Sequence, residues 1–120
     1  MKKRIVVLAM LMVAVLFSTE VMAQEFKGLD KSPMDAASYP SSYRVSDKLV
    51  KITYGRPQLK GRALAKLAPN DKVWRTGANE APEITFYKDV KFGGKDVKAG
   101  TYTLFTIPKT EGDWVVILST

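Results

Sequence analysis

Apolar and polar residues alternate along much of the chain from residue 49 onward, and this period of two predicts β-strands. In residues 49–54, Val50, Ile52 and Tyr54 fall on one face of the predicted strand, and the polar residues between them fall on the other. Gly55-Arg56-Pro57 follows and ends this strand.

The same period returns later in the chain. Apolar positions in 84–86 and 90–92 lead into Gly93-Gly94, which predicts a hairpin turn. Residues 101–107 are the richest β stretch, and 114–118 predict a last core strand. The apolar set of 101–107 changes face between its fourth and fifth residues, which predicts either a bulge or a strand buried on both sides.

Two segments lack this alternation. Residues 63–68 carry Leu64 and Leu67 three apart, which predicts one or two helical turns. Residues 24–43 are polar, contain Pro33 and Pro40, and predict an extended N-terminal arm.

Short strands separated by Gly and Pro turns are typical of an all-β antiparallel sandwich, immunoglobulin-like or transthyretin-like. The expected domain covers residues 44–120. Four or five clear strands are few for two sheets, so we expect the sandwich to be incomplete at its C-terminus.

The N-terminus predicts an export signal. Lys2-Lys3-Arg4 precedes the apolar run 5–17, and Val21-Met22-Ala23 has the small-x-small pattern that a signal peptidase cuts. We therefore expect residues 1–23 to be a signal peptide cleaved between Ala23 and Gln24, which would leave no stable membrane span. The expected location is periplasmic or secreted, and an uncleaved anchor is the alternative.

Composition narrows the chemistry. The chain has no Cys and no His, which excludes disulfides, thiol and Ser-His nucleophiles, and imidazole metal sites. We expect no metal and no cofactor. Composition disfavours an enzyme without deciding the question, since catalysis would have to rely on carboxylates, Lys, Tyr or Ser-Lys pairs. The net charge is +7, but the lysines are scattered in a way that does not suit nucleic acid. An anionic partner, such as an envelope polysaccharide, fits this charge.

The densest group of functional side chains is Val73-Trp74-Arg75-Thr76-Gly77-Ala78-Asn79-Glu80. One interpretation is a structural turn, in which Trp74 fills the core, Gly77 has a positive φ, and the polar side chains hold the loop backbone. The other is a polar pocket for a small ligand. The candidate ligand-binding residues come from this run and from the loop after the first strand: Arg56, Lys60, Arg62, Trp74, Arg75, Asn79 and Glu80.

Three functions remain open. The first is a non-catalytic binding module, because arginines can grip a carboxylate, a phosphate or an acidic sugar through paired N–H donors. The second is a structural or interaction domain of the envelope, to which another protein adds a strand. The third is a carboxylate-dependent hydrolase that uses Glu80 and Glu83.

Several motifs occur in an order that resembles one exported bacterial family, domain of unknown function 2911 (DUF2911), of the Bacteroidetes type. They are Tyr54-Gly55-Arg56-Pro57, Lys60-Gly61-Arg62, Val73-Trp74-Arg75-Thr76-Gly77-Ala78-Asn79-Glu80 and Ala99-Gly100-Thr101-Tyr102-Thr103-Leu104-Phe105-Thr106-Ile107-Pro108. The resemblance runs from about Ser32 to Ser119 and implies an exported β-rich domain without an assigned activity. Family members usually continue with further strands, which implies that this chain is C-terminally short.

Overall fold

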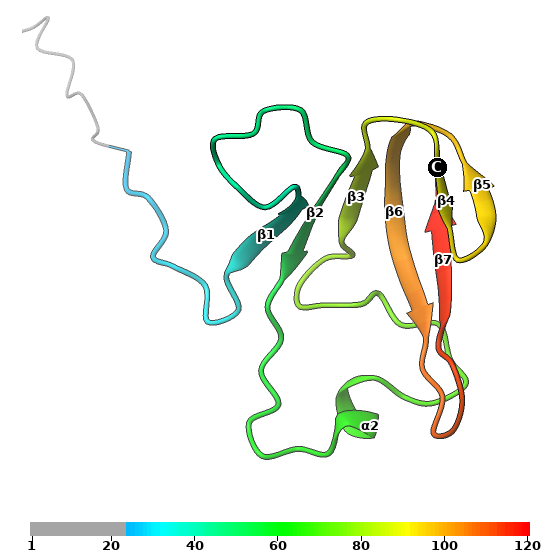
Figure 1. Cartoon of the computed structure of the whole chain (residues 1–120). Helices are drawn as coiled ribbons and strands as arrows, with labels where there is room; N and C mark the ends of the chain where they lie inside the picture. The colour runs from blue at the N-terminus through cyan, green and yellow to red at the C-terminus, as the bar shows by residue number, and fades with distance from the viewer. Residues whose placement is uncertain (1–23) are drawn as a thin grey trace, which may run out of the picture.

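The computed structural model describes residues 24–120, and its regular elements are strands apart from one short helix (Figure 1). The predicted signal peptide, residues 1–23, lies outside the described residues. The elements are β1 (Met34–Tyr39), β2 (Val50–Gly55), α2 (Leu64–Leu67), β3 (Glu83–Phe86), β4 (Val90–Phe92), β5 (Lys95–Val97), β6 (Gly100–Ile107) and β7 (Val115–Ser119).

Five strands form one antiparallel sheet in the order β1-β2-β3-β6-β7. Strands β4 and β5 form a separate hairpin around the Gly93-Gly94 turn, as the sequence predicted. The all-β, antiparallel, sandwich-like fold class is therefore confirmed, and the short α2 lies where the Leu64–Leu67 spacing placed it. The choice between an immunoglobulin-like and a transthyretin-like topology stays a prediction.

Strand β1 was not expected. Residues 34–39 lie within the predicted arm, yet they pair with β2 from Met34 opposite Gly55 to Tyr39 opposite Val50. The Arg56 amide extends the ladder by donating to the Pro33 carbonyl at 3.0 Å. Backbone pairing at an edge needs no alternation of side chains, so the apolar pattern did not reveal this strand.

The core lies between one face of the sheet and the β4–β5 hairpin. Ile84, Phe86 and Leu104 are its buried centre, and Phe92 of the hairpin packs on Phe86 with ring centroids 5.6 Å apart. Tyr102 meets Phe86 edge-on at 6.2 Å. Aromatic rings at these separations add to the free energy gained by burying apolar area, so this cluster holds the hairpin on the sheet.

Strand β6 contains the change of apolar face for which a bulge or burial on both sides was predicted. It pairs residue for residue with β7 from Thr103 opposite Ser119 to Ile107 opposite Val115, so the two strands keep a regular register. Leu104 and Thr106 are buried, while Phe105 and Ile107 on the other face are half-buried. The strand is thus partly covered on both sides, the second of the two predicted alternatives.

Strand β2 ends in a very close contact between two backbones. A Cβ on Gly55 would lie 2.1 Å from the Ala78 carbonyl oxygen, and the Ala78 amide donates to the Gly55 carbonyl at 3.0 Å. Only glycine permits such an approach. This contact fixes the loop between α2 and β3 across the end of the sheet.

We therefore predict that Gly55→Ala lowers the free energy of unfolding by roughly 1–3 kcal/mol, because backbone must shift to admit the methyl group. Urea unfolding followed by tryptophan fluorescence would measure the change. Gly28→Ala is the matched control, since a Cβ at Gly28 would meet nothing within 4 Å. Equal unfolding midpoints for the two variants would contradict the prediction.

Candidate functional site

The Trp74–Glu80 loop is fixed at its start by strand β6. Trp74 and Thr106 exchange two backbone hydrogen bonds of 2.7 and 3.0 Å. The Thr76 hydroxyl donates to the Trp74 carbonyl at 3.1 Å and bonds the Thr106 hydroxyl at 2.7 Å. The loop then turns sharply, with φ of 61° at Thr76, 133° at Gly77 and 67° at Asn79. The positive φ predicted for Gly77 is confirmed.

This loop and the loop after β2 enclose an open pocket of about 240 Å³. Four of the residues proposed from sequence share its lining: Lys60, Arg62, Arg75 and Asn79. The sequence reasoning missed Ser32 of the N-terminal segment, together with Pro57, Gln58 and Leu67. We call this space the cationic pocket.

Backbone carbonyls hold both guanidinium groups in place. Arg62 donates from Nε to the Leu59 carbonyl at 2.9 Å and from a terminal nitrogen to the Gln58 carbonyl at 2.8 Å. Arg75 makes longer bonds of 3.3 Å to the carbonyls of Gly77 and Asn79. A guanidinium has five N–H donors, so each arginine retains donors for a ligand.

The cations of this pocket have no ionic partner among residues 24–120. Five ion pairs occur in that part of the chain, and they use Arg56, Lys88, Lys91, Lys98 and Lys109. None involves Lys60, Arg62 or Arg75. Three positive charges that line one pocket and form no ion pair produce a local positive potential that favours anions.

Asn79 has a structural role at the pocket edge. Its amide nitrogen donates to Asp30 Oδ1 at 3.2 Å and to the Ser32 carbonyl at 3.4 Å, which ties the N-terminal segment to the loop. The backbone N–H of Ser32, and then the Asn79 amide, hold the pKa of Asp30 below its usual value. Asp30 therefore lies at the edge of the pocket, and the nearby positive charges that also lower its pKa are those of Lys27 and Lys31.

The other predicted site residues lie elsewhere. The Arg56 side chain faces Asp35 of β1, with Nε 3.8 Å from Oδ2, and Glu80 does not line the cationic pocket. Trp74 is half-buried and lines a neighbouring open hollow of about 220 Å³, which we call the apolar hollow. The predicted set is thus divided between two adjacent spaces and the surface around them.

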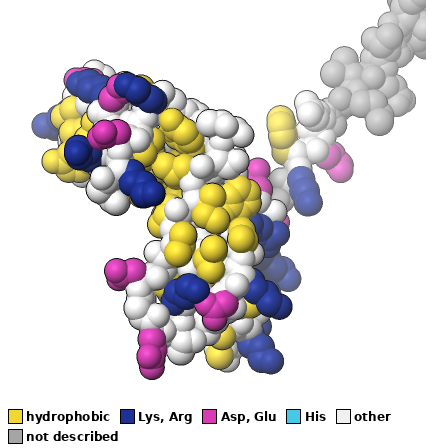
Figure 2. All heavy atoms as spheres, turned by 90° about the vertical axis from the view of Figure 1, so that its right-hand side faces the viewer, with side chains coloured by type: hydrophobic (Ala, Val, Ile, Leu, Met, Phe, Trp, Pro, Cys, Tyr) yellow, Lys and Arg dark blue, Asp and Glu magenta, His cyan; other side chains and the backbone are white. Residues whose placement is uncertain are grey.

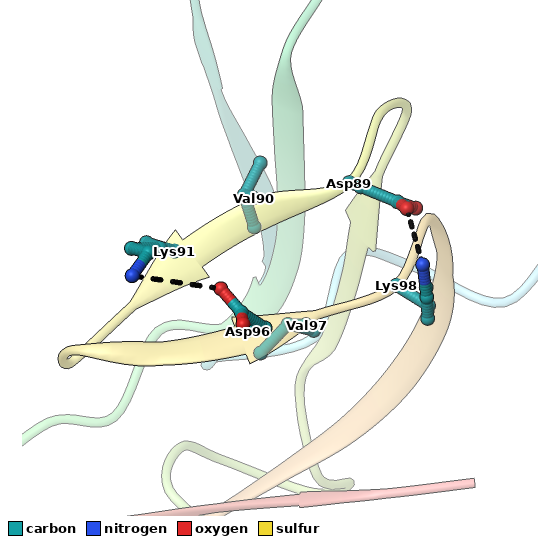
Figure 3. A pocket seen from close by; sticks show the side chains of 6 residues that line it. All are labelled: Asp89, Val90, Lys91, Asp96, Val97 and Lys98. Atoms are coloured by element: carbon teal, nitrogen blue, oxygen red, sulfur yellow. Dashed lines mark hydrogen bonds and ion pairs between the residues drawn. The ribbon is translucent and has the colours of Figure 1, made fainter.

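A larger hollow of about 430 Å³ lies along the β4–β5 hairpin (Figure 3). Its charged groups pair with one another, since Lys98 Nζ lies 2.7 Å from Asp89 and Lys91 Nζ lies 3.8 Å from Asp96. Hydrogen bonds from Lys98 and from the Ala99 amide lower the pKa of Asp89, and Asp89 raises the pKa of Lys98. Because its charges are matched, this hollow offers less to a charged ligand than the cationic pocket does.

No group of three or more carboxylates in the described part of the chain is arranged to hold a metal ion. No helix among residues 24–120 has the length and apolar content needed to cross a membrane.

Comparison with family models matches residues 32–120 to the family described as Protein of unknown function (DUF2911), so the chain belongs to this family. The resemblance to this family, proposed from the motifs, is thereby confirmed, while the Bacteroidetes type and export stay predictions. No curated protein and no solved structure matches the chain.

The hairpin ion pair generates a pH prediction. Because the folded pKa of Asp89 is lowered, its ion pair contributes stability above the unfolded pKa and loses that contribution as pH falls through the folded pKa. Lys98→Ala removes the largest cause, so the pKa of Asp89 should rise toward its ordinary value of 3.8 and acid unfolding should begin at higher pH. Carbon-detected NMR titration of the Asp89 carboxyl measures this shift. Lys91→Ala is the control and should leave the pKa of Asp89 unchanged.

Proposed function

We propose that this member of the DUF2911 family is an exported, non-catalytic module that binds a small anionic ligand in the cationic pocket. The observation that carries the proposal is the gathering of Lys60, Arg62 and Arg75 in the lining of one pocket, where none of them forms an ion pair with a residue of 24–120. Unpaired cations on fixed loops are suited to a carboxylate or phosphate group.

The size of the pocket limits the ligand. About 240 Å³ of open space suits a single carboxylate, a phosphate, or one acidic sugar at the end of a glycan. Carbonyl bonds already orient both arginines, so binding costs less side-chain entropy than it would with free side chains. The pocket is thus partly preorganised for an anion.

The hydrolase alternative receives less support from the geometry. Glu83 is the first residue of β3 and pairs with Thr103. Its neighbour Ile84 faces the core, so Glu83 lies on the opposite face of the strand. Neither Glu80 nor Glu83 lines the cationic pocket, so a ligand held there would not be placed against them. Binding without chemistry remains the function that we propose.

The test is anion binding by the double variant Lys60→Gln, Arg62→Gln. Its affinity for inorganic phosphate and for acetate should fall roughly tenfold, equivalent to about 1.4 kcal/mol, because two of three ligand-facing charges are removed. Amide NMR titrations measure the dissociation constants and show that the variant is folded. The matched control, Lys88→Gln with Lys91→Gln, removes two charges outside the pocket. Equal weakening in both double variants would overturn the proposal in favour of a general charge effect.

A second candidate function, strand addition, is favoured by the exposed edge at β7. Strand β7 is the last in the sheet order, and its residues Val115 and Val116 are 46% and 44% exposed. Figure 2, seen from the side on which β5 and β7 lie in Figure 1, shows hydrophobic side chains gathered in the middle of this face between charged ones. The strand itself has no charge and no proline, the usual devices that block edge pairing.

The hydrogen-bond pattern shows which groups of β7 are free. The backbone N–H groups of Leu104 and Thr106 donate to the carbonyls of Pro82 and Trp74, on the side of β6 away from β7. Their partners Leu118 and Val116 are therefore non-hydrogen-bonded pairs, whose backbone N–H and C=O groups point outward. These groups form a template for another strand.

We propose a second copy of this chain as the occupant of that edge. Two uncharged β7 strands can pair antiparallel about a two-fold axis without placing like charges opposite each other. The acidic turn with Glu111 and Asp113 precedes β7, while the lysine-bearing hairpin lies beside its other end, where Leu118 packs. Antiparallel pairing would bring the acidic turn of one copy toward the β4–β5 hairpin of the other, where three lysines stand against two aspartates in residues 89–98.

Val116→Pro tests this interface. The substitution removes one outward N–H and spares the bonds between β6 and β7, so it should abolish association while the fold persists. Sedimentation at increasing concentration measures the oligomeric state, and amide NMR confirms folding. A monomeric parent protein over the whole concentration range, or a Val116→Pro variant that still dimerises, would refute the proposal.

A further inference from the structure

The apolar hollow adjoins the cationic pocket. Pro57 and Gly77 line both spaces, so together they form the border between them. The remaining lining of the hollow comes from the end of β2, from the start of the Trp74 loop and from the residue before β3: Ile52, Tyr54, Gly55, Trp74, Thr76 and Pro82. A ligand held by the cations therefore lies next to a hydrocarbon-lined surface.

This lining offers little to polar groups. The Thr76 hydroxyl already bonds the Trp74 carbonyl and the Thr106 hydroxyl, and the Trp74 backbone is paired with β6. Pro57 and Pro82 have no backbone N–H. Sugar hydroxyls placed here would lose water without gaining enough partners, whereas hydrocarbon would gain by leaving water.

At Gly77, no side chain stands between the cationic pocket and the apolar hollow. A Cβ at this position would lie 3.1 Å from the Gly55 carbonyl oxygen, and the φ of 133° disfavours any side chain. The border therefore consists of a proline ring and bare backbone, with no long side chain to separate the two parts of a ligand.

We propose that the ligand is a free small molecule that joins an anionic group to a hydrocarbon group, such as a short alkyl carboxylate. The carboxylate lies in the cationic pocket against Lys60, Arg62 and Arg75, and the alkyl group lies in the apolar hollow against Trp74. This inference rests on the proposed anion-binding function and adds the chemical class of the ligand.

The experiment is an amide NMR titration of the protein with acetate, butanoate and hexanoate. Each added methylene should tighten binding roughly threefold, because it leaves water for a partly open apolar surface. The indole N–H of Trp74 should shift with butanoate and hexanoate but little with acetate. Trp114, the other tryptophan of the chain, donates its indole N–H to the Lys109 carbonyl at 3.2 Å and serves as the internal control.

Two matched controls separate the parts of the ligand. Hexanol has the hydrocarbon group without the charge, and Lys60→Gln with Arg62→Gln removes charge from the protein. Hexanol should bind the parent protein much more weakly than hexanoate does, and hexanoate should bind the double variant much more weakly than it binds the parent. Both results are expected because the carboxylate and the alkyl group bind together.

The outcomes separate this inference from the function on which it rests. If no anion binds, the proposed function fails and the inference fails with it. If all three carboxylates bind equally and Trp74 does not respond, anion binding stands and the hydrocarbon inference is overturned. If hexanol binds as tightly as hexanoate, the hollow binds hydrocarbon independently, which also overturns the joint ligand.

Discussion

The contact between Gly55 and Ala78 is the constraint on which the candidate site depends. Two backbones meet there so closely that a Cβ on Gly55 would lie 2.1 Å from the Ala78 carbonyl oxygen. The backbone pair between Trp74 and Thr106 fixes the same loop a few residues earlier. Held at both points, the loop crosses the end of the sheet and separates two spaces, with charged side chains on one side and Trp74 on the other. Neither space would keep its shape if the loop were free to move, because both share Gly77.

The distribution of charge distinguishes parts of the molecule that have different tasks. On the β4–β5 hairpin, Lys91 pairs with Asp96 and Lys98 pairs with Asp89. The hairpin is held on the core by Phe92, which packs on Phe86. Exposed ion pairs of this kind contribute little stability, but they keep the net charge of the hairpin low. At the cationic pocket, one aspartate accepts a hydrogen bond from Asn79 at the edge, and the three cations of the lining have no ionic partner within residues 24–120. The hollow at the hairpin is larger than the cationic pocket, but its charges are paired, so the cationic pocket is the better site for a charged ligand.

The sequence predicted the strands that bury a face, because burial imposes the period of two on β2, β3, β6 and the hairpin. It did not predict β1, whose residues Met34–Tyr39 lie at an edge and pair through backbone alone. For the same reason, the sequence did not show that the Arg56 side chain faces Asp35 of this strand. The sequence could not show that the Trp74 side chain lies beyond the border of the cationic pocket, because that position follows from its backbone pairing with Thr106, more than thirty residues away in the chain. Lys60, Arg62, Arg75 and Asn79 were predicted from residue type and gather as expected, since both loops start or end beside Gly55.

Positive φ angles occur at both glycine and non-glycine residues. Glycine has the positive φ in the turns at Gly93, Gly94 and Gly112, and Asp71 has it in the turn after α2. Around the two adjoining spaces, Lys60 and Thr76 adopt φ of 51° and 61°, which costs a non-glycine residue on the order of 1 kcal/mol or more. Glycine would relieve this strain at either position but would remove the Lys60 charge from the pocket, or the Thr76 hydroxyl that links Trp74 to β6. The backbone strain at these two residues is therefore explained by the roles of their side chains. Lys60 supplies charge to the cationic pocket, and the Thr76 hydroxyl fixes the wall of the apolar hollow.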